Sequence, residues 1–225
     1  KHCSHRNVQY LQEREPDGIG LRFLLRQQPS LEAQLANLAD EIAYNAHDVD
    51  DGLRSGLLQW EDVLQVPLVA EYHAQVRAEW PSLQGRRLWY ETIRRMLSAQ
   101  ILNVVSATLQ RLQALQPANV EVIRRSPPLL GFDDAMRDRS QVLKRFLMRA
   151  LYRHPQVVQN MEQAQQVICD LFAHYSQQPQ SMPPEFAERT DKARAVADYI
   201  AGMTDRFALR EHVLLTGRQV LHAGF

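Results

Sequence analysis

The sequence predicts an all-α protein, and three observations support that prediction. The chain is rich in residues that favour helices, namely Leu, Ala, Gln, Arg and Glu, and strand-like alternation is scarce. Hydrophobic residues recur at helical spacing in two long segments, residues 31–55 and 85–116. Capping and breaking residues bound these segments, since Ser30 precedes the first and Pro117 follows the second.

The first half of the chain predicts five helices. An irregular stretch over residues 16–18 (Pro-Asp-Gly) precedes a short apolar helix over residues 19–25. The first strong helix covers residues 31–55, because Ser30 is a suitable N-cap and Gly56 a suitable C-terminal stop. The remaining helices of this half are expected over residues 60–64, 68–80 and 85–116.

The second half begins with a connector over residues 118–134, where Pro127, Pro128 and Gly131 interrupt any helix. A polar, proline-containing linker is expected over residues 177–184. Helices are predicted over residues 136–152, 156–175 and 189–213. No repeat or composition shift marks a domain boundary, so we expect one all-α unit over residues 1–225.

Composition and charge exclude several classes of protein. Lys plus Arg and Asp plus Glu both number 26, so no overall field marks a nucleic-acid or membrane binder. No apolar run reaches the roughly 20 residues of a membrane helix, and two cysteines make no disulfide framework. We therefore expect a cytoplasmic protein with no membrane partner. Because the first residue is Lys rather than Met, we also expect the chain to start inside a longer gene product.

The helix over residues 31–55 presents two different faces at about 100° per residue. The predicted buried stripe consists of apolar residues: Leu35, Leu38, Ala39, Ile42, Ala46, Val49 and Leu53. The other face carries Asp40, Tyr44 and Asp48 at successive i, i+4 steps, with His47 and Asp51 beside them. Such a face can be an ordinary solvated surface. Alternatively, a divalent cation or a hydrogen-bonding ligand would relieve the repulsion among its acids.

Four stretches resemble the deoxyguanosine triphosphate triphosphohydrolases (dGTPases) and their relatives in the HD superfamily. They are LADEIAYNAHDVDDGLRSG (38–56), VIRRSPPLLGFDDAM (122–136), LKRFLMRALYRHPQV (143–157) and RAVADYIAGMTDRFALREH (194–212). The resemblance implies the multi-helix orthogonal bundle of that superfamily, of which this chain would be the C-terminal part. It also implies hydrolysis of a deoxynucleoside triphosphate to the deoxynucleoside and inorganic triphosphate.

The family's metal is held by a His, a His-Asp dipeptide and a more distant Asp. The distant Asp matches Asp40, and the nucleoside contacts match Tyr44, which would pack on the sugar, and Asp48, which would meet the 3′-hydroxyl. The dipeptide His47-Asp48 therefore does not match the metal-binding one, which we expect in an upstream segment that this chain lacks. One departure is Glu41, where some relatives place a Lys that meets phosphate.

The implied cofactor is a divalent metal, either Mg, Mn or a transition metal such as Fe, Co or Ni. Asp40 alone cannot hold such an ion tightly, so we expect metal binding to be weak or lost and the chain to be catalytically incomplete. The departing triphosphate needs cations opposite it. Candidates for that role are Arg86, Arg87, Arg94, Lys192, Arg194 and Arg206, although each can equally be a surface or ion-pair residue.

On this resemblance, residues 1–116 correspond to the end of the HD core with its long helix, and residues 117–225 to the C-terminal helical region. The leading hypothesis is a deoxynucleoside triphosphate triphosphohydrolase, an enzyme that the family implies to be a homo-oligomer. The alternative is a catalytically silent helical module that binds nucleotides or single-stranded nucleic acid, such as single-stranded DNA, or that serves oligomerisation. No catalytic residue is assigned by the sequence.

Overall fold

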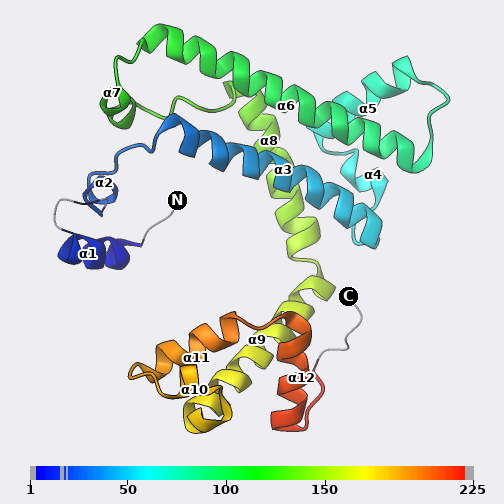
Figure 1. Cartoon of the computed structure of the whole chain (residues 1–225). Helices are drawn as coiled ribbons and strands as arrows, with labels where there is room; N and C mark the ends of the chain where they lie inside the picture. The colour runs from blue at the N-terminus through cyan, green and yellow to red at the C-terminus, as the bar shows by residue number, and fades with distance from the viewer. Residues whose placement is uncertain (1–3, 16–17, 19, 221–225) are drawn as a thin grey trace. The chain divides into compact units, whose positions relative to one another are not determined.

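The computed structural model describes residues 4–15, 18 and 20–220, and every regular element in that part is a helix (Figure 1). The predicted all-α class is therefore confirmed. The chain divides into two compact units, Lys1–Leu151 and Tyr152–Phe225. The assignment of residues 1–116 to the end of the HD core, and of residues 117–225 to a C-terminal helical region, stays a prediction. Within the described part, no helix is long and apolar enough to cross a membrane.

Unit 1 begins with α1 (His5–Arg14) and α2 (Gly20–Leu24), which pack on each other. Helix α1 was not predicted, although Ser4 caps it by accepting a hydrogen bond from the Asn7 backbone at 3.2 Å. Helix α3 (Leu31–Ser55) has the predicted bounds. The Ser30 hydroxyl accepts from the Ala33 amide, and Gly56 ends the helix in the left-handed conformation at φ 76°.

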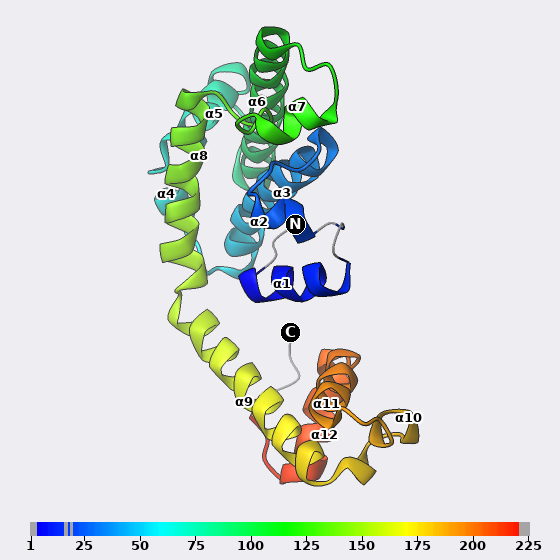
Figure 2. The ribbon, with the colours of Figure 1, turned by 90° about the vertical axis from the view of Figure 1, so that its left-hand side faces the viewer.

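Unit 1 also contains α4 (Trp60–Val63), α5 (Pro67–Glu79), α6 (Gly85–Leu115) and α8 (Asp134–Leu147). Helices α3 and α5 each pack against both α6 and α8, as Figure 2 shows for α5 and α8. The centre of this packing is apolar and fully buried, with Leu68, Met96, Leu143 and Leu147 among its largest side chains. A π-helical turn, Met148–Tyr152, continues α8. The predicted connector contains a short helix, α7 (Val120–Arg125), that Asn119 caps.

Unit 2 consists of α9 (Pro155–Gln177), a 3₁₀ turn (Pro179–Ser181), α10 (Pro184–Ala187), α11 (Lys192–Ala201) and α12 (Asp205–Thr216). Helices α11 and α12 both pack on α9. The core between them contains Val167, Leu171, Tyr175 and Val196. The single helix predicted over residues 189–213 is wrong, because the chain breaks after Ala201 and starts α12 with a new cap. The Thr204 hydroxyl accepts a hydrogen bond from the Phe207 amide at 3.3 Å.

The predicted buried stripe of α3 is correct only in the second half of the helix. Ile42, Ala46, Val49 and Leu53 are buried, whereas Leu35 is 51% exposed and Ala39 is also exposed. In the first half the buried position is Gln34 instead, because its side chain anchors the loop after α7. This half of α3 therefore borders a cavity rather than the helical core.

Candidate functional site

A cavity of about 980 Å³ lies beside the first half of α3, entirely within unit 1. Its walls come from α2, from α3, from the end of α7 and from the loop that follows α7. The side chains that matter most for its chemistry are Arg22, Phe23, Asp40, Arg124, Pro128 and Leu130. The cavity thus combines apolar walls with two guanidinium groups and one carboxylate, a composition suited to a small charged ligand.

Hydrogen bonds between distant segments hold the cavity walls together. The Gln34 amide group donates to the Pro29 carbonyl at 3.0 Å and accepts from the backbone amides of Leu129 and Leu130 at 3.1 and 3.2 Å. The Gln28 amide donates to the Arg124 carbonyl at 2.8 Å. Because Gln34 is buried, these bonds are shielded from water and fix α7 and its loop against α3.

The three residues predicted on one face of α3 keep that arrangement in the structure. Asp40 lines the cavity, and Tyr44 and Asp48 follow one and two turns later. Tyr44 is 58% exposed. Asp48 is half-buried, and burial raises the pKa of its carboxyl group; nearby Asp51 raises that pKa further, while His47 opposes the rise.

A metal site does not follow from these residues by themselves. Among the described residues, no group of three or more His, Cys, Asp or Glu side chains could hold a metal ion. Sites that bind a metal through protein side chains usually need at least three such ligands. Of the ligands of the divalent metal that the resemblance implies, the described residues could therefore supply one, Asp40. The neighbouring Glu41 pairs with Lys144 of α8 at 2.9 Å.

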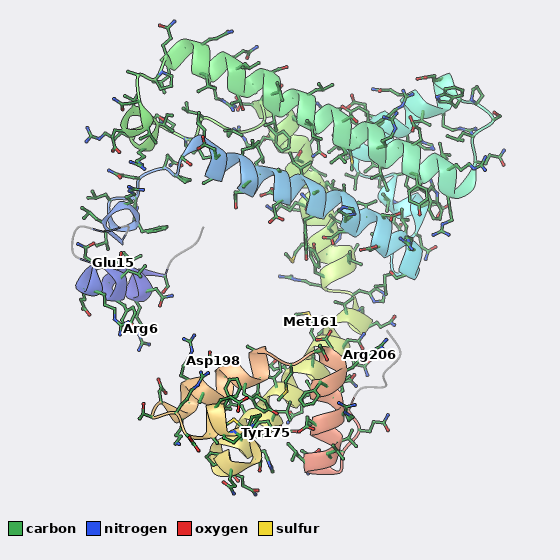
Figure 3. All side chains as sticks on the ribbon, viewed as in Figure 1. Arg6, Glu15, Met161, Tyr175, Asp198 and Arg206 are labelled. Carbon is green, nitrogen blue, oxygen red and sulfur yellow. The ribbon has the colours of Figure 1, made fainter. Side chains whose placement is uncertain are left out.

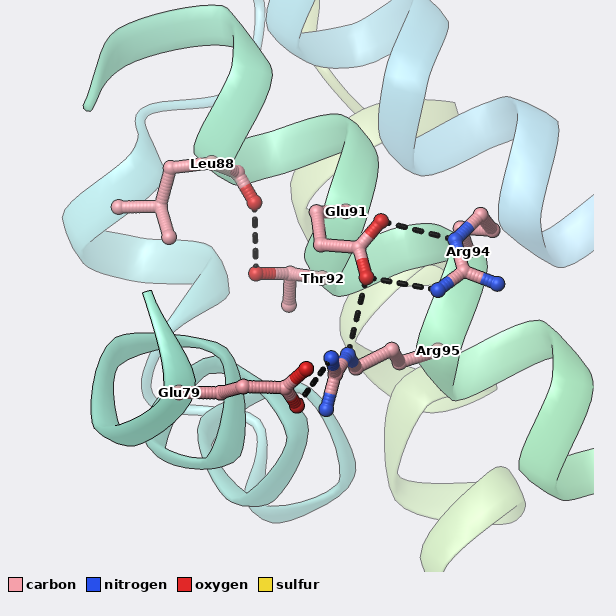
Figure 4. Close-up of polar contacts among 6 residues, drawn as sticks. All are labelled: Glu79, Leu88, Glu91, Thr92, Arg94 and Arg95. Atoms are coloured by element: carbon pink, nitrogen blue, oxygen red, sulfur yellow. Dashed lines mark hydrogen bonds and ion pairs between the residues drawn. The ribbon is translucent and has the colours of Figure 1, made fainter. Parts of the chain in front are cut away.

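Three of the predicted phosphate-binding cations lie on α6, away from the residues that line the cavity. Arg86 and Arg87 are exposed in the first turn of that helix. Arg94 donates two hydrogen bonds to Glu91 at 2.7 and 2.8 Å, and Arg95 donates to the same carboxylate at 2.9 Å (Figure 4). These two arginines hold the pKa of Glu91 at about 2. The phosphate role of Arg94 stays a prediction.

The other three predicted cations belong to unit 2. Lys192 donates to the Ala187 carbonyl at 2.7 Å, and Arg194 donates to Asp198 at 2.7 Å. Arg206 is exposed in the first turn of α12, and Figure 3 labels it together with Asp198. Hydrogen bonds from Arg194 hold the pKa of Asp198 below its usual range, and Arg189 contributes to the same shift. The phosphate roles of Lys192, Arg194 and Arg206 likewise stay predictions.

Sequence reasoning missed the cavity and its two arginines. Arg124 lies in the stretch VIRRSPPLLGFDDAM, which matched the family, but no periodicity connects it with Arg22 in α2. Both line the cavity, where the contacts of Gln28 and Gln34 described above hold the neighbouring segments together. The one local signal was the capping sequence at Asn119, which predicts a helix start just before Arg124.

Comparison with known proteins shows which proteins this chain is similar to. A model of the phosphohydrolase-associated domain matches residues 130–213. A protein of Bordetella pertussis (strain Tohama I), named deoxyguanosinetriphosphate triphosphohydrolase-like, is 47% identical over 214 residues, which cover 94% of this chain and 54% of the relative. The chain is similar over most of its length to proteins named dGTPase-like. The resemblance predicted from the four motifs is therefore confirmed.

Two further dGTPase-like proteins show the same pattern. The one from Ralstonia nicotianae is 45% identical and covers 98% of this chain and 56% of its own length. The one from Nitrosomonas europaea is 42% identical, over 87% of this chain and 53% of the relative's length. The chain thus spans about half the length of the dGTPase-like relatives that it matches.

Proposed function

We propose that this chain is part of a phosphohydrolase that cleaves a deoxynucleoside triphosphate to the deoxynucleoside and inorganic triphosphate. The observation that carries the proposal is the position of Asp40 in the cavity wall, with Tyr44 and Asp48 continuing along the same face of α3. The names of the relatives, which denote dGTPase-like proteins, support the same reaction class.

The three residues have separate roles in this proposal. Asp40 contributes one carboxylate to a divalent metal whose other ligands lie outside the described residues. The exposed ring of Tyr44 packs on the deoxyribose, because an aromatic face offers a large apolar surface at little entropic cost. Asp48 accepts a hydrogen bond from the sugar hydroxyl. The metal, when bound, would polarise the phosphoryl group that is attacked. Assembly as a homo-oligomer and binding of single-stranded DNA stay predictions.

The decisive test replaces Asp40 in the intact protein that carries this chain. We expect Asp40→Asn to lower triphosphate release from dGTP, in the presence of Mn²⁺ or Mg²⁺, by at least about a hundredfold. The helical circular dichroism should not change, because Asp40 is exposed on α3. The readout is the inorganic triphosphate formed.

The matched control is Asp62→Asn, which removes an exposed carboxylate of unit 1 that does not line the cavity. We expect this variant to keep the activity of the wild-type protein. Wild-type turnover in Asp40→Asn would refute the role of Asp40. Failure of the wild-type protein to release triphosphate from any deoxynucleoside triphosphate would refute the reaction itself.

A further inference from the structure

We propose that the cavity of unit 1 binds the phosphate groups of a nucleotide through Arg22 and Arg124. The inference rests on the proposed function and names phosphate contacts that the sequence did not single out. Within the cavity lining, these two residues are the only ones with a positive side chain. The other polar lining groups are amides, a serine hydroxyl and the Asp40 carboxylate.

The two arginines face a common space from different elements. A second cavity of about 320 Å³ adjoins the first, and Arg22, Gln27 and Arg124 belong to the lining of both. These three side chains therefore form the wall that the two cavities share. An anion at this wall can contact both guanidinium groups, each of which offers paired N–H donors that match phosphate oxygens.

The charges at this wall favour an incoming anion. The Arg124 side chain is only 16% exposed and has one carboxylate partner, Glu121 of its own helix, whose side chain is 52% exposed. Among the described residues, Arg22 has no carboxylate partner, and it lies exposed at the cavity. A partly buried guanidinium with a single, largely solvated partner gains from a second anion. Glu121 lines the second cavity but not the first, so a phosphate group reaches Arg124 from the first cavity.

The remaining wall indicates what the phosphates are attached to. Phe23, Pro128 and Leu130 give the cavity apolar surface, and Phe23 offers an aromatic face. Without a metal, Asp40 repels a phosphate group, so the phosphates belong at the two arginines and the sugar on the Tyr44 side of Asp40, as in the proposed function. A nucleoside triphosphate has this division into a charged end and a neutral end. The wall is also held in place before any ligand binds, by the bonds of Gln28 and Gln34.

The test measures binding without turnover. The wild-type protein and its variants are titrated calorimetrically, in EDTA, with inorganic triphosphate, dGTP and deoxyguanosine. We expect Arg22→Ala and Arg124→Ala each to weaken binding of triphosphate and dGTP at least tenfold. The affinity of Arg124→Lys for triphosphate and dGTP should lie between the affinities of the alanine variants and the wild-type protein. Lysine keeps the positive charge but lacks the paired N–H donors of the guanidinium group. Binding of deoxyguanosine should not depend on either arginine.

The matched control is Arg125→Ala. Arg125 is the neighbour of Arg124 in α7 but is exposed and absent from both linings, so its loss should change affinity less than twofold. Thermal midpoints show whether each variant is folded. Equal affinity of Arg22→Ala, Arg124→Ala and wild type for triphosphate, or no binding by the wild type, would overturn the inference. Triphosphate release that is lost in Asp40→Asn but unchanged in the arginine variants would refute the inference and leave the proposed function standing.

Discussion

Asp48 is a carboxylate whose position on α3 costs stability. Its half-buried side chain loses hydration and lies near Asp51, and both effects raise its pKa in the folded protein. An acid whose pKa is raised by folding destabilises the folded state at every pH at which its carboxyl group is ionised. This cost disappears once the pH has fallen below 3.8, the ordinary pKa of an Asp side chain. A residue placed for ligand binding rather than for folding would carry such a cost.

Replacing Asp48 should therefore stabilise the protein. We expect Asp48→Asn to raise the thermal midpoint at pH 7 by about 1–2 °C, a small gain because solvent screens part of the repulsion. The gain should vanish when the melts are repeated below pH 3.8, where the wild-type carboxyl is neutral too. Glu61→Gln on α4, whose side chain is exposed rather than half-buried, serves as a control without this effect. A lower midpoint for Asp48→Asn at pH 7 would contradict this assignment of the cost.

Sequence reasoning went furthest for those site residues that share one helix. Asp40, Tyr44 and Asp48 follow from the helical period alone, and the structure keeps them on one face. Arg22, Gln34 and Arg124 could not be found that way, because their proximity depends on a loop that closes over nearly a hundred residues. A buried Gln at position 34 breaks the apolar stripe instead of extending it, so the pattern pointed to Leu35.

Among the elements, those with strong local signals were predicted almost residue for residue. Ser30 and Gly56 bound α3, and Pro117 follows the end of α6 closely. Errors arose where a weak cap competes with a continuous apolar pattern, as at Thr204 between α11 and α12. There, a hydroxyl group that accepts one hydrogen bond from a backbone amide is enough to start a new helix. The spacing of apolar residues does not reveal such a cap.

The close approach of α3 to the following turn makes a prediction at this scale. A Cβ atom added at Gly52 would lie 2.5 Å from Cδ1 of Leu58, and the Leu58 amide already donates to the Gly52 carbonyl at 2.9 Å. We expect Gly52→Ala to destabilise the protein by about 1–3 kcal/mol through overpacking, measured by urea unfolding. In Gly202→Ala the added atom would meet nothing nearer than 3.5 Å, so this control should change stability little. Equal stability of the two variants would argue against the tight contact.

At the scale of the molecule, a buried histidine of unit 2 connects segments that are distant in the sequence. His212 of α12 is 1% exposed; its Nε2 lies 2.9 Å from Asp170 Oδ2 on α9, and its Nδ1 lies 3.1 Å from the Arg218 carbonyl. Asp170 also accepts a hydrogen bond from Gln166. The bond from His212 is the largest cause that holds the pKa of Asp170 below its usual value. One side chain thus connects α12, α9 and the segment after α12.

Loss of this connection should loosen unit 2 alone. We expect His212→Ala to cost about 2–3 kcal/mol and to speed amide exchange in α9 and α12, but not in α6. Asp170→Asn should act in the same direction at pH 7. Because the lowered pKa stabilises the fold only where the carboxyl is ionised, the difference between this variant and wild type should shrink below pH 3.8. Unchanged exchange in α12 of His212→Ala would contradict the role of the pair.

The bonds of Gln34 also fix the order in which the cavity can be made during synthesis. Its walls come from α2 and α3 and from residues up to Leu130, and Gln34 and Leu129 are 95 positions apart. At about 5–20 residues per second, a ribosome takes about 5–20 seconds to extend the chain over that interval. Throughout that time the Gln34 side chain lacks the backbone amides of Leu129 and Leu130 that it binds in the folded protein. The cavity beside α3 can therefore form only after the ribosome has passed Leu130.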